Sequence, residues 1–221
     1  MTDARAPILE TIPVGPLQCN CTILGDPVSG EALVVDPGDE PERILEALNS
    51  HRLTPVALLH THAHFDHIGG SRRVKEATGA AIRLHRADFP LYDALPQQAA
   101  HFGLSAGEPL PPDRPVEDGE VIRFGGYAVT AIHTPGHTPG STCYHLEDAG
   151  IPGVLFSGDT LFRRSIGRTD LWGGDSETIL SSIRERLYRL PGDLRVVCGH
   201  GPDTTIGEES ARNPFVRAGT L

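Results

Sequence analysis

The chain has 221 residues, of which 38% are hydrophobic and 22% charged, as expected for a globular protein with one sizeable core. Its formal net charge of −10 argues against a nucleic-acid partner, because a phosphate backbone binds basic surfaces. No stretch approaches the roughly 18 apolar residues of a membrane span, and the polar start does not resemble a signal peptide. We therefore expect a cytoplasmic protein that binds no membrane and is a monomer or a small homo-oligomer.

The first third of the chain predicts strands that alternate with helices. Expected strands are Ile8–Val14, Cys19–Leu24, Ala32–Asp36 and Val56–Leu59. The last of these is a wholly apolar run, which is typical of a strand buried on both faces. A helix is expected from Pro41, because Ile44, Leu45 and Leu48 fall on one face. Another is expected from the Gly69-Gly70 pair to Ala77.

The rest of the chain predicts one irregular segment and a second block of strands and helices. Residues 86–118 are rich in Pro, Gln and Gly, and we expect loops there with one short helix. Expected strands are Ala80–Leu84, Val121–Phe124, Ala128–His133, Thr142–Leu146, Val154–Ser157 and Leu194–Val197. Expected helices are Ser176–Leu190, with Asp175 as its N-cap, and Thr205–Arg212. No linker divides the halves, so we predict one α/β or α+β domain with two sheets face to face and helices outside.

A cluster of four potential metal ligands follows the expected buried strand at 56–59. The segment Thr61–His67 contains His62, His64, Asp66 and His67 within six positions. His62 and His64 are two residues apart, so an extended or turning backbone can direct both the same way. Asp66 and His67 are adjacent and must diverge, which suits two neighbouring metal ions better than one.

Three further segments each place a polar side chain beside glycine at the end of an expected strand. They are Thr134–Gly140 around His137, Phe156–Thr160 around Asp159, and Cys198–Pro202 around His200. Glycine next to a ligand lets the backbone turn sharply and approach a metal ion closely. Each segment alone is weak evidence, but together with the first cluster they predict a metal centre.

The four segments read T-H-x-H-x-D-H, P-G-H-T-P-G, G-D and G-H-G-P, and this series resembles the metallo-β-lactamase superfamily. Within it, the chain is most similar to glyoxalase II-type enzymes (hydroxyacylglutathione hydrolases), in their short bacterial form. The resemblance runs from Asn20-Cys21 to Asn213-Pro214. It implies an αβ/βα sandwich with metal ions at one edge. The C-terminal helical domain of larger glyoxalase II enzymes is not expected here.

The resemblance also implies which residues bind two divalent metal ions. One ion would be bound by His62, His64 and His137, and the other by Asp66, His67 and His200, with Asp159 between them. This nitrogen and oxygen set suits zinc first, with iron or manganese as alternatives. A hydroxide bridging two such ions would attack the carbonyl of a small thioester or ester, such as S-D-lactoylglutathione. Asp66 is the residue expected to orient that nucleophile.

Arg168 is the residue expected to contact the substrate. In glyoxalase II relatives a cation at this place helps to hold the glycyl carboxylate of glutathione, a contact that suits a guanidinium. The same relatives carry Tyr two residues later, where this chain has Asp170. A structural salt bridge between Arg168 and a nearby Asp is therefore the alternative interpretation.

The sequence is also compatible with other functions. Persulfide dioxygenases share the fold and bind one iron ion, for which the ligands here would be His62, His137 and Asp159. A lactonase or phosphodiesterase could use the same pair of metal ions. A non-enzymatic metal protein or an RNA-binding nuclease is disfavoured by the intact ligand set and the acidic charge. β-Lactam hydrolysis is disfavoured because the best-known metallo-β-lactamases usually carry Cys where Asp159 lies and are normally exported.

Overall fold

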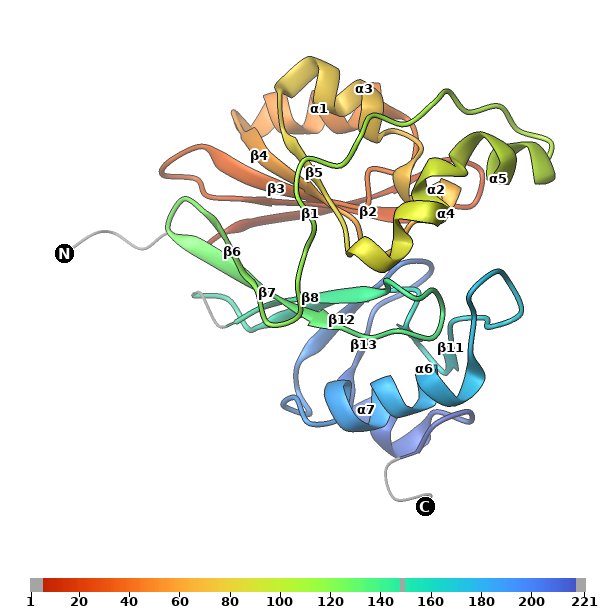
Figure 1. Ribbon diagram of the computed structural model, residues 1–221. Helices are drawn as coiled ribbons and strands as arrows, with labels where there is room; N and C mark the ends of the chain where they lie inside the picture. The colour runs from red at the N-terminus through yellow and green to blue at the C-terminus, as the bar shows by residue number, and fades with distance from the viewer. Residues whose placement is uncertain (1–5, 148–149, 218–221) are drawn as a thin grey trace.

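The first half of the chain forms a five-stranded sheet in the order β1-β2-β3-β4-β5. The computed structural model describes residues 6–147 and 150–217; residues 1–5, on which the expected absence of a signal peptide rests, lie outside them. The strands are β1 Ile8–Val14, β2 Cys19–Gly25, β3 Glu31–Val35, β4 Thr54–Leu59 and β5 Ala81–Arg83. Helices α1 Pro41–His51 and α3 Ser71–Thr78 cover the outer face of this sheet (Figure 1).

The second half forms a six-stranded sheet in the order β13-β12-β9-β8-β7-β6. Its strands are β6 Val121–Phe124, β7 Tyr127–His133, β8 Thr142–Leu146, β9 Val154–Gly158, β12 Arg195–Cys198 and β13 Thr204–Thr205. Helices α6 Ser176–Ser182 and α7 Ile206–Arg212 lie on its outer face (Figure 1). A small hairpin, β10 Leu161–Phe162 and β11 Ser165–Ile166, follows β9. The predicted sandwich of two sheets with helices outside is confirmed.

Three buried clusters hold these layers together. One packs α1 and α3 on the first sheet and includes Ile44 and Leu58. A second lies between the two sheets and includes Leu33 and Phe156. A third packs α6 and its continuation on the second sheet. The core therefore has three layers, and burial of this apolar surface is the main force that fixes the two sheets relative to each other.

The expected loops are present in residues 102–118, but the prediction of one short helix within 86–118 was wrong. The segment contains a 3₁₀ turn at Arg86–Asp88 and two helices, α4 Phe89–Asp93 and α5 Leu95–His101, rather than one short helix. Pro90 and Pro96 lie in the first turn of α4 and α5, where the missing N–H costs nothing. The two prolines that suggested loops therefore mark the starts of two helices.

Two smaller differences concern helix bounds. The helix expected over 176–190 runs as α6 to Ser182 and continues as a π-helical turn, Ile183–Leu187, which ends three residues early. Asp175 caps it as expected, because its side chain accepts a hydrogen bond from the Thr178 N–H. A short helix within the histidine cluster, α2 Phe65–Ile68, was not predicted. In the described part of the chain, no helix is both long and apolar enough to cross a membrane.

Candidate metal centre

The predicted ligand segments all follow strands that end at the same edge of the sandwich. The Thr61–His67 segment follows β4, and the loop with His137 joins β7 to β8. Asp159 follows β9, and His200 follows β12. Because β9 and β12 are parallel neighbours, their carboxyl ends bring Asp159 and His200 together. The fold thus brings side chains from both sheets to one place.

The three histidines that the resemblance implied as ligands of one metal ion, His62, His64 and His137, lie together and form the first group. His137 Nε2 lies 3.2 Å from His62 Nε2 and 2.9 Å from His64 Nδ1. Two nitrogens bound at about 2.0–2.1 Å to a tetrahedral zinc ion would lie roughly 3.3–3.4 Å apart. The three nitrogens therefore have nearly the spacing that a shared metal ion requires.

Asp66, His67 and His200 form the second group. His200 Nε2 lies 3.1 Å from Asp66 Oδ2 and 3.2 Å from His67 Nε2. Helix α2 explains how Asp66 and His67 can both take part, because consecutive helical residues diverge while the short helix keeps both beside the loop of His200.

Asp159 lies between the two groups. Its Oδ1 is 3.4 Å from His67 Nε2, and its Oδ2 is 3.7 Å from His137 Nε2. Oδ1 is buried and has no hydrogen-bond partner among the described residues, which is costly unless a cation binds it. Burial alone would raise the pKa of Asp159, but the imidazoles of His67, His137 and His200 hold it well below its usual range. An ionised carboxylate facing both groups fits a bridging ligand.

The imidazole nitrogens that face away from the cluster have oxygen partners. His67 Nδ1 lies 3.0 Å from Asp36 Oδ2, and His62 Nδ1 lies 3.1 Å from Thr61 Oγ1. His137 Nδ1 and His200 Nδ1 lie 2.8 Å and 2.9 Å from the backbone carbonyl oxygens of residues 168 and 17. Because these Nδ1–H groups donate outward, each Nε2 faces the cluster and can offer its lone pair to a cation when it carries no proton.

The protonation of the histidines differs between the groups. Burial lowers the pKa of His62 and lowers that of His64 to about 3, so both rings are neutral and can bind a cation at neutral pH. Burial also acts to lower the pKa of His200, but its hydrogen bond with Asp66 and the charge of Asp159 outweigh burial and raise it. Burial likewise acts to lower the pKa of His67, but its charged neighbours outweigh burial and raise it, so a cation at the second group competes with protons for both rings.

Comparison with known proteins identifies the family. The metallo-β-lactamase superfamily profile matches residues 14–200. The chain belongs to this superfamily. Hydroxyacylglutathione hydrolase GloC of Haemophilus influenzae is 39% identical over 212 residues, which cover 95% of this chain and 98% of GloC.

Two solved structures resemble the fold over almost its whole length. BLEG-1, a B3 metallo-β-lactamase, has a TM-score of 0.86 and 39% identity, and the match covers 95% of this chain and 99% of BLEG-1. The protein TTHA1623, in a di-iron-bound form, has a TM-score of 0.83 and 39% identity, with 96% and 100% of the two chains covered. The sequence resemblance to the superfamily is thus confirmed.

Two buried aspartates next to this metallo-β-lactamase-type cluster were missed by sequence reasoning. Asp36, directly after β3, accepts hydrogen bonds from the Thr61 N–H and hydroxyl, both at 2.7 Å, besides facing His67. It therefore fixes the start of the histidine segment and one ligand of the second group. The sequence did contain a signal for a role of Asp36 near the cluster. Asp36 ends an apolar expected strand and precedes Pro37-Gly38, a turn like those beside the predicted ligands.

Asp88 is the second missed residue, and it joins the two loops that carry the first ligand group. Its Oδ2 accepts hydrogen bonds from the Ala63 N–H at 3.0 Å and the Thr138 hydroxyl at 2.8 Å, and its Oδ1 accepts one from the Gly140 N–H at 2.6 Å. Burial raises the pKa of Asp88, and among the described residues no Lys or Arg forms an ion pair with it. Its place in the irregular 86–118 segment gave no sequence signal.

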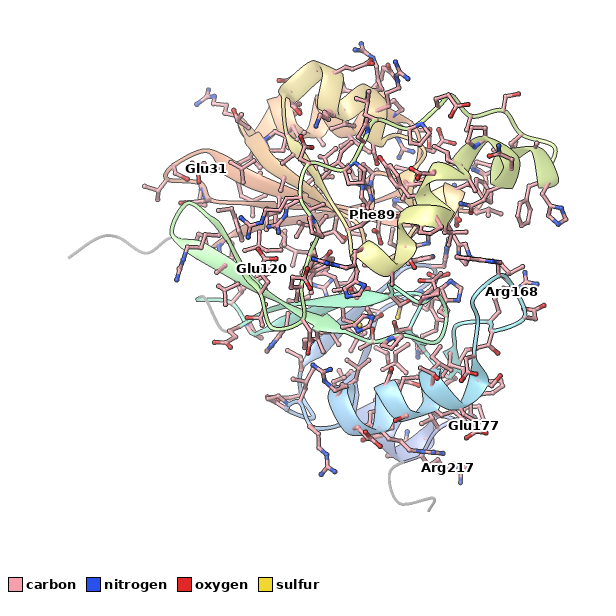
Figure 2. All side chains as sticks on the ribbon, viewed as in Figure 1. Glu31, Phe89, Glu120, Arg168, Glu177 and Arg217 are labelled. Carbon is pink, nitrogen blue, oxygen red and sulfur yellow. The ribbon has the colours of Figure 1, made fainter. Side chains whose placement is uncertain are left out.

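The cluster opens into a pocket of about 370 Å³ that both halves of the fold line. Arg168 lies on the loop after β11, on the side of the molecule where α4 and α5 project (Figure 2). Its Nε and Nη2 donate to Asp170 Oδ1 and Oδ2 at 2.7 Å and 2.8 Å. Arg168 thus lines the pocket, as a substrate contact would, but it also forms the salt bridge of the alternative interpretation.

Proposed function

We propose that this protein hydrolyses thioesters of a small thiol, with S-D-lactoylglutathione as the first candidate, at a centre of two divalent metal ions. The observation that carries the proposal is the pair of ligand groups with the buried, unpartnered Asp159 oxygen between them. The likeness to GloC of Haemophilus influenzae, over 95% of this chain, supports the choice of substrate. A small-molecule substrate is consistent with a pocket of about 370 Å³.

Two divalent cations bound by these ligands would acidify a water molecule and polarise the carbonyl of the substrate. The chain's own residues then position the reaction. Outward hydrogen bonds hold His62 and His137, and Asp88 fixes the loops that carry all three histidines, so the first group needs little reorganisation. The pocket above them leaves room for the carbonyl and its two substituents.

Asp66 is the residue that we assign to orienting the attacking water. Burial alone would raise the pKa of Asp66, but His67 and His200 lower it, so the carboxylate is ionised. Its Oδ2 faces His200 at 3.1 Å, and the other oxygen can accept a hydrogen bond from the water. No serine or cysteine nucleophile is required. The four cysteines are buried, and burial raises the pKa of Cys143 to about 11 and that of Cys198 to about 12.

We infer zinc as the resident metal, because five imidazoles and two carboxylates match its preferred ligands. Iron is the main alternative, since TTHA1623 has been crystallised in a di-iron-bound form, and manganese is the third. Metal content of freshly purified protein distinguishes the three.

Arg168 would bind a carboxylate of the thiol by exchanging Asp170 for the substrate. Both side chains are exposed, and an exposed ion pair contributes only about 0–1 kcal/mol, so the exchange is inexpensive. The variant Asp170→Asn should therefore lower the KM for S-D-lactoylglutathione by roughly threefold. Arg168→Ala should raise it. A KM that responds to neither change would exclude Arg168 as a substrate contact.

β-Lactam hydrolysis is the second candidate, because BLEG-1 is described as a B3 metallo-β-lactamase and is 39% identical to this chain. Both reactions add a nucleophile to a carbonyl, so the same metal centre suits either. The substrate that gives the higher kcat/KM decides between them.

The test is release of free thiol from S-D-lactoylglutathione, with hydrolysis of a chromogenic cephalosporin measured in parallel. We expect rapid thiol release that is lost in Asp159→Ala and retained in Asp193→Asn, a control that removes an exposed carboxylate that does not line the pocket. One iron ion per chain, no thiol release and oxygen uptake with glutathione persulfide would replace the proposal with the dioxygenase. Two metal ions with neither activity would redirect the search to lactones and phosphodiesters.

A further inference from the structure

Beyond the metal ligands, the walls of the 370 Å³ pocket are largely apolar and aromatic. They come from the β1–β2 turn, from the segment of α2, α4 and α5, and from the loop between β11 and α6. The apolar lining residues are Leu17, Phe65, Leu91, Phe102, Leu171 and Trp172. Apolar walls around a few polar groups are typical of sites that bind the body of a small molecule.

The outermost of these side chains are exposed although they are large and apolar. Phe102 is 47% exposed, Trp172 is 58% exposed and Leu17 is 45% exposed. The Phe102 ring packs against the ring of Phe65, a buried residue of α2, with the two ring centroids 4.9 Å apart. Phe102 and Trp172 come from opposite halves of the fold and line one pocket, so we call them the aromatic rim.

Charge in the same pocket is limited. Arg168 is the one Lys or Arg among its described lining residues, and both oxygens of Asp170 already accept hydrogen bonds from it. The charges of Asp66 and Asp159 face the metal groups. A charged thiol such as glutathione could therefore contact one cationic side chain here, Arg168, which already pairs with Asp170. Most of the remaining contact surface is apolar.

We propose that the aromatic rim binds the acyl group of the substrate and selects acyl groups with an apolar chain over the small, polar lactoyl group. The inference rests on the proposed function, because it assigns one arm of the thioester to the pocket of that metal centre. Arg168 lies at the same pocket and would take the charged thiol arm, which leaves the apolar walls to the acyl arm. Burying each CH₂ of that arm against the rim strengthens binding.

Trp172 makes the inference testable without catalysis. It is the single tryptophan of the chain, so protein fluorescence reports directly on the rim. The metal-loaded protein is titrated with S-methyl-, S-butyl- and S-hexylglutathione, thioethers that share one thiol and cannot be hydrolysed. We expect the Kd to fall with chain length, by up to about fourfold for each added CH₂. A Kd that does not depend on chain length overturns the inference.

The variant Phe102→Ala should flatten this dependence on chain length. Because Phe102 is half exposed, its removal leaves the core intact. Phe215→Ala is the matched control, since Phe215 is 57% exposed and does not line the pocket. In turnover, the ratio of kcat/KM for S-hexanoyl- over S-lactoylglutathione should fall by about tenfold in Phe102→Ala and stay unchanged in the control. If the dependence of Kd on chain length and the ratio of kcat/KM values were equal in the two variants, the rim would be rejected as the acyl site.

Failure of the inference and failure of the proposed function give different results. Thiol release from S-D-lactoylglutathione with a flat Kd series keeps the thioesterase and rejects the rim. A steep Kd series without thiol release from any thioester rejects the thioesterase, and supports only the binding of an apolar ligand arm at the rim.

Discussion

Replacing Asp88 with asparagine should weaken one of the two metal groups selectively. Its two oxygens accept three hydrogen bonds, from the Ala63 N–H, the Thr138 hydroxyl and the Gly140 N–H. Ala63 lies between His62 and His64, and the other two donors lie in the loop of the third ligand. The carboxylate therefore sets the distance between the loops that form the first group.

An asparagine side chain has one acceptor oxygen, so its NH₂ must face either the Gly140 N–H or the other two donors. A buried donor left without an acceptor costs about 1–3 kcal/mol. Loss of an outer partner of this kind typically weakens metal affinity by roughly 10–100-fold. The group of Asp66, His67 and His200 makes no hydrogen bond to Asp88 among the described residues, so its affinity should change by less than about threefold.

The assay is a zinc titration of apoprotein in competition with a chelating dye, which resolves two binding steps. In Asp88→Asn we expect one step to weaken by about 10–100-fold and the other to stay near the wild-type value. Circular dichroism establishes that the variant is folded, and Asp193→Asn controls for the loss of one carboxylate. Two unchanged steps in a folded Asp88→Asn protein would refute the reasoning, as would equal weakening of both.

Three other perturbations test the site and the fold. Gly199→Ala should lower the metal content by at least half, because a Cβ at this position would lie 2.2 Å from Asp159 Oδ1. The control Gly107→Ala should keep the wild-type metal content, because a Cβ there would meet no atom within 4 Å. Removing the metal ions with a chelator should lower Tm by roughly 8–16 °C, because a ligand present at 1,000 times its Kd stabilises the folded state by about 4 kcal/mol. An unchanged Tm would mean that no metal ion is bound in the native state. Burial alone would raise the pKa of Asp26, but hydrogen bonds from backbone N–H groups and a serine hydroxyl lower it, so its contribution to stability is present above about pH 4 and lost as pH falls further. Asp26→Asn should thus be less stable at pH 7 by about 1–2 kcal/mol in urea unfolding. A difference that does not shrink as the pH is lowered below about 4 would contradict this.

The metal centre was predictable because its signal is local in sequence. His62, His64, Asp66 and His67 lie within six positions after an apolar strand, and the other candidates each lie beside glycine at a strand end. The structure brings all seven predicted side chains together, although their role as ligands stays a prediction. Alternating strand and helix patterns also sufficed for the two-sheet sandwich.

The parts that sequence could not supply depend on contacts between distant segments. Asp88 is defined by donors at 63, 138 and 140, which no local pattern connects to it. The helices α4 and α5 were hidden because proline suggests a loop unless the helix start is known. Whether Arg168 pairs with Asp170 or is free for substrate depends on rotamers that the sequence leaves open.

The most direct test of a two-metal thioesterase is a zinc titration of apoprotein with thiol release from S-D-lactoylglutathione followed at each addition. We expect binding to saturate at two ions per chain and thiol release to rise to a maximum as the second ion binds. Saturation at one ion, or two bound ions without release of thiol, would contradict it.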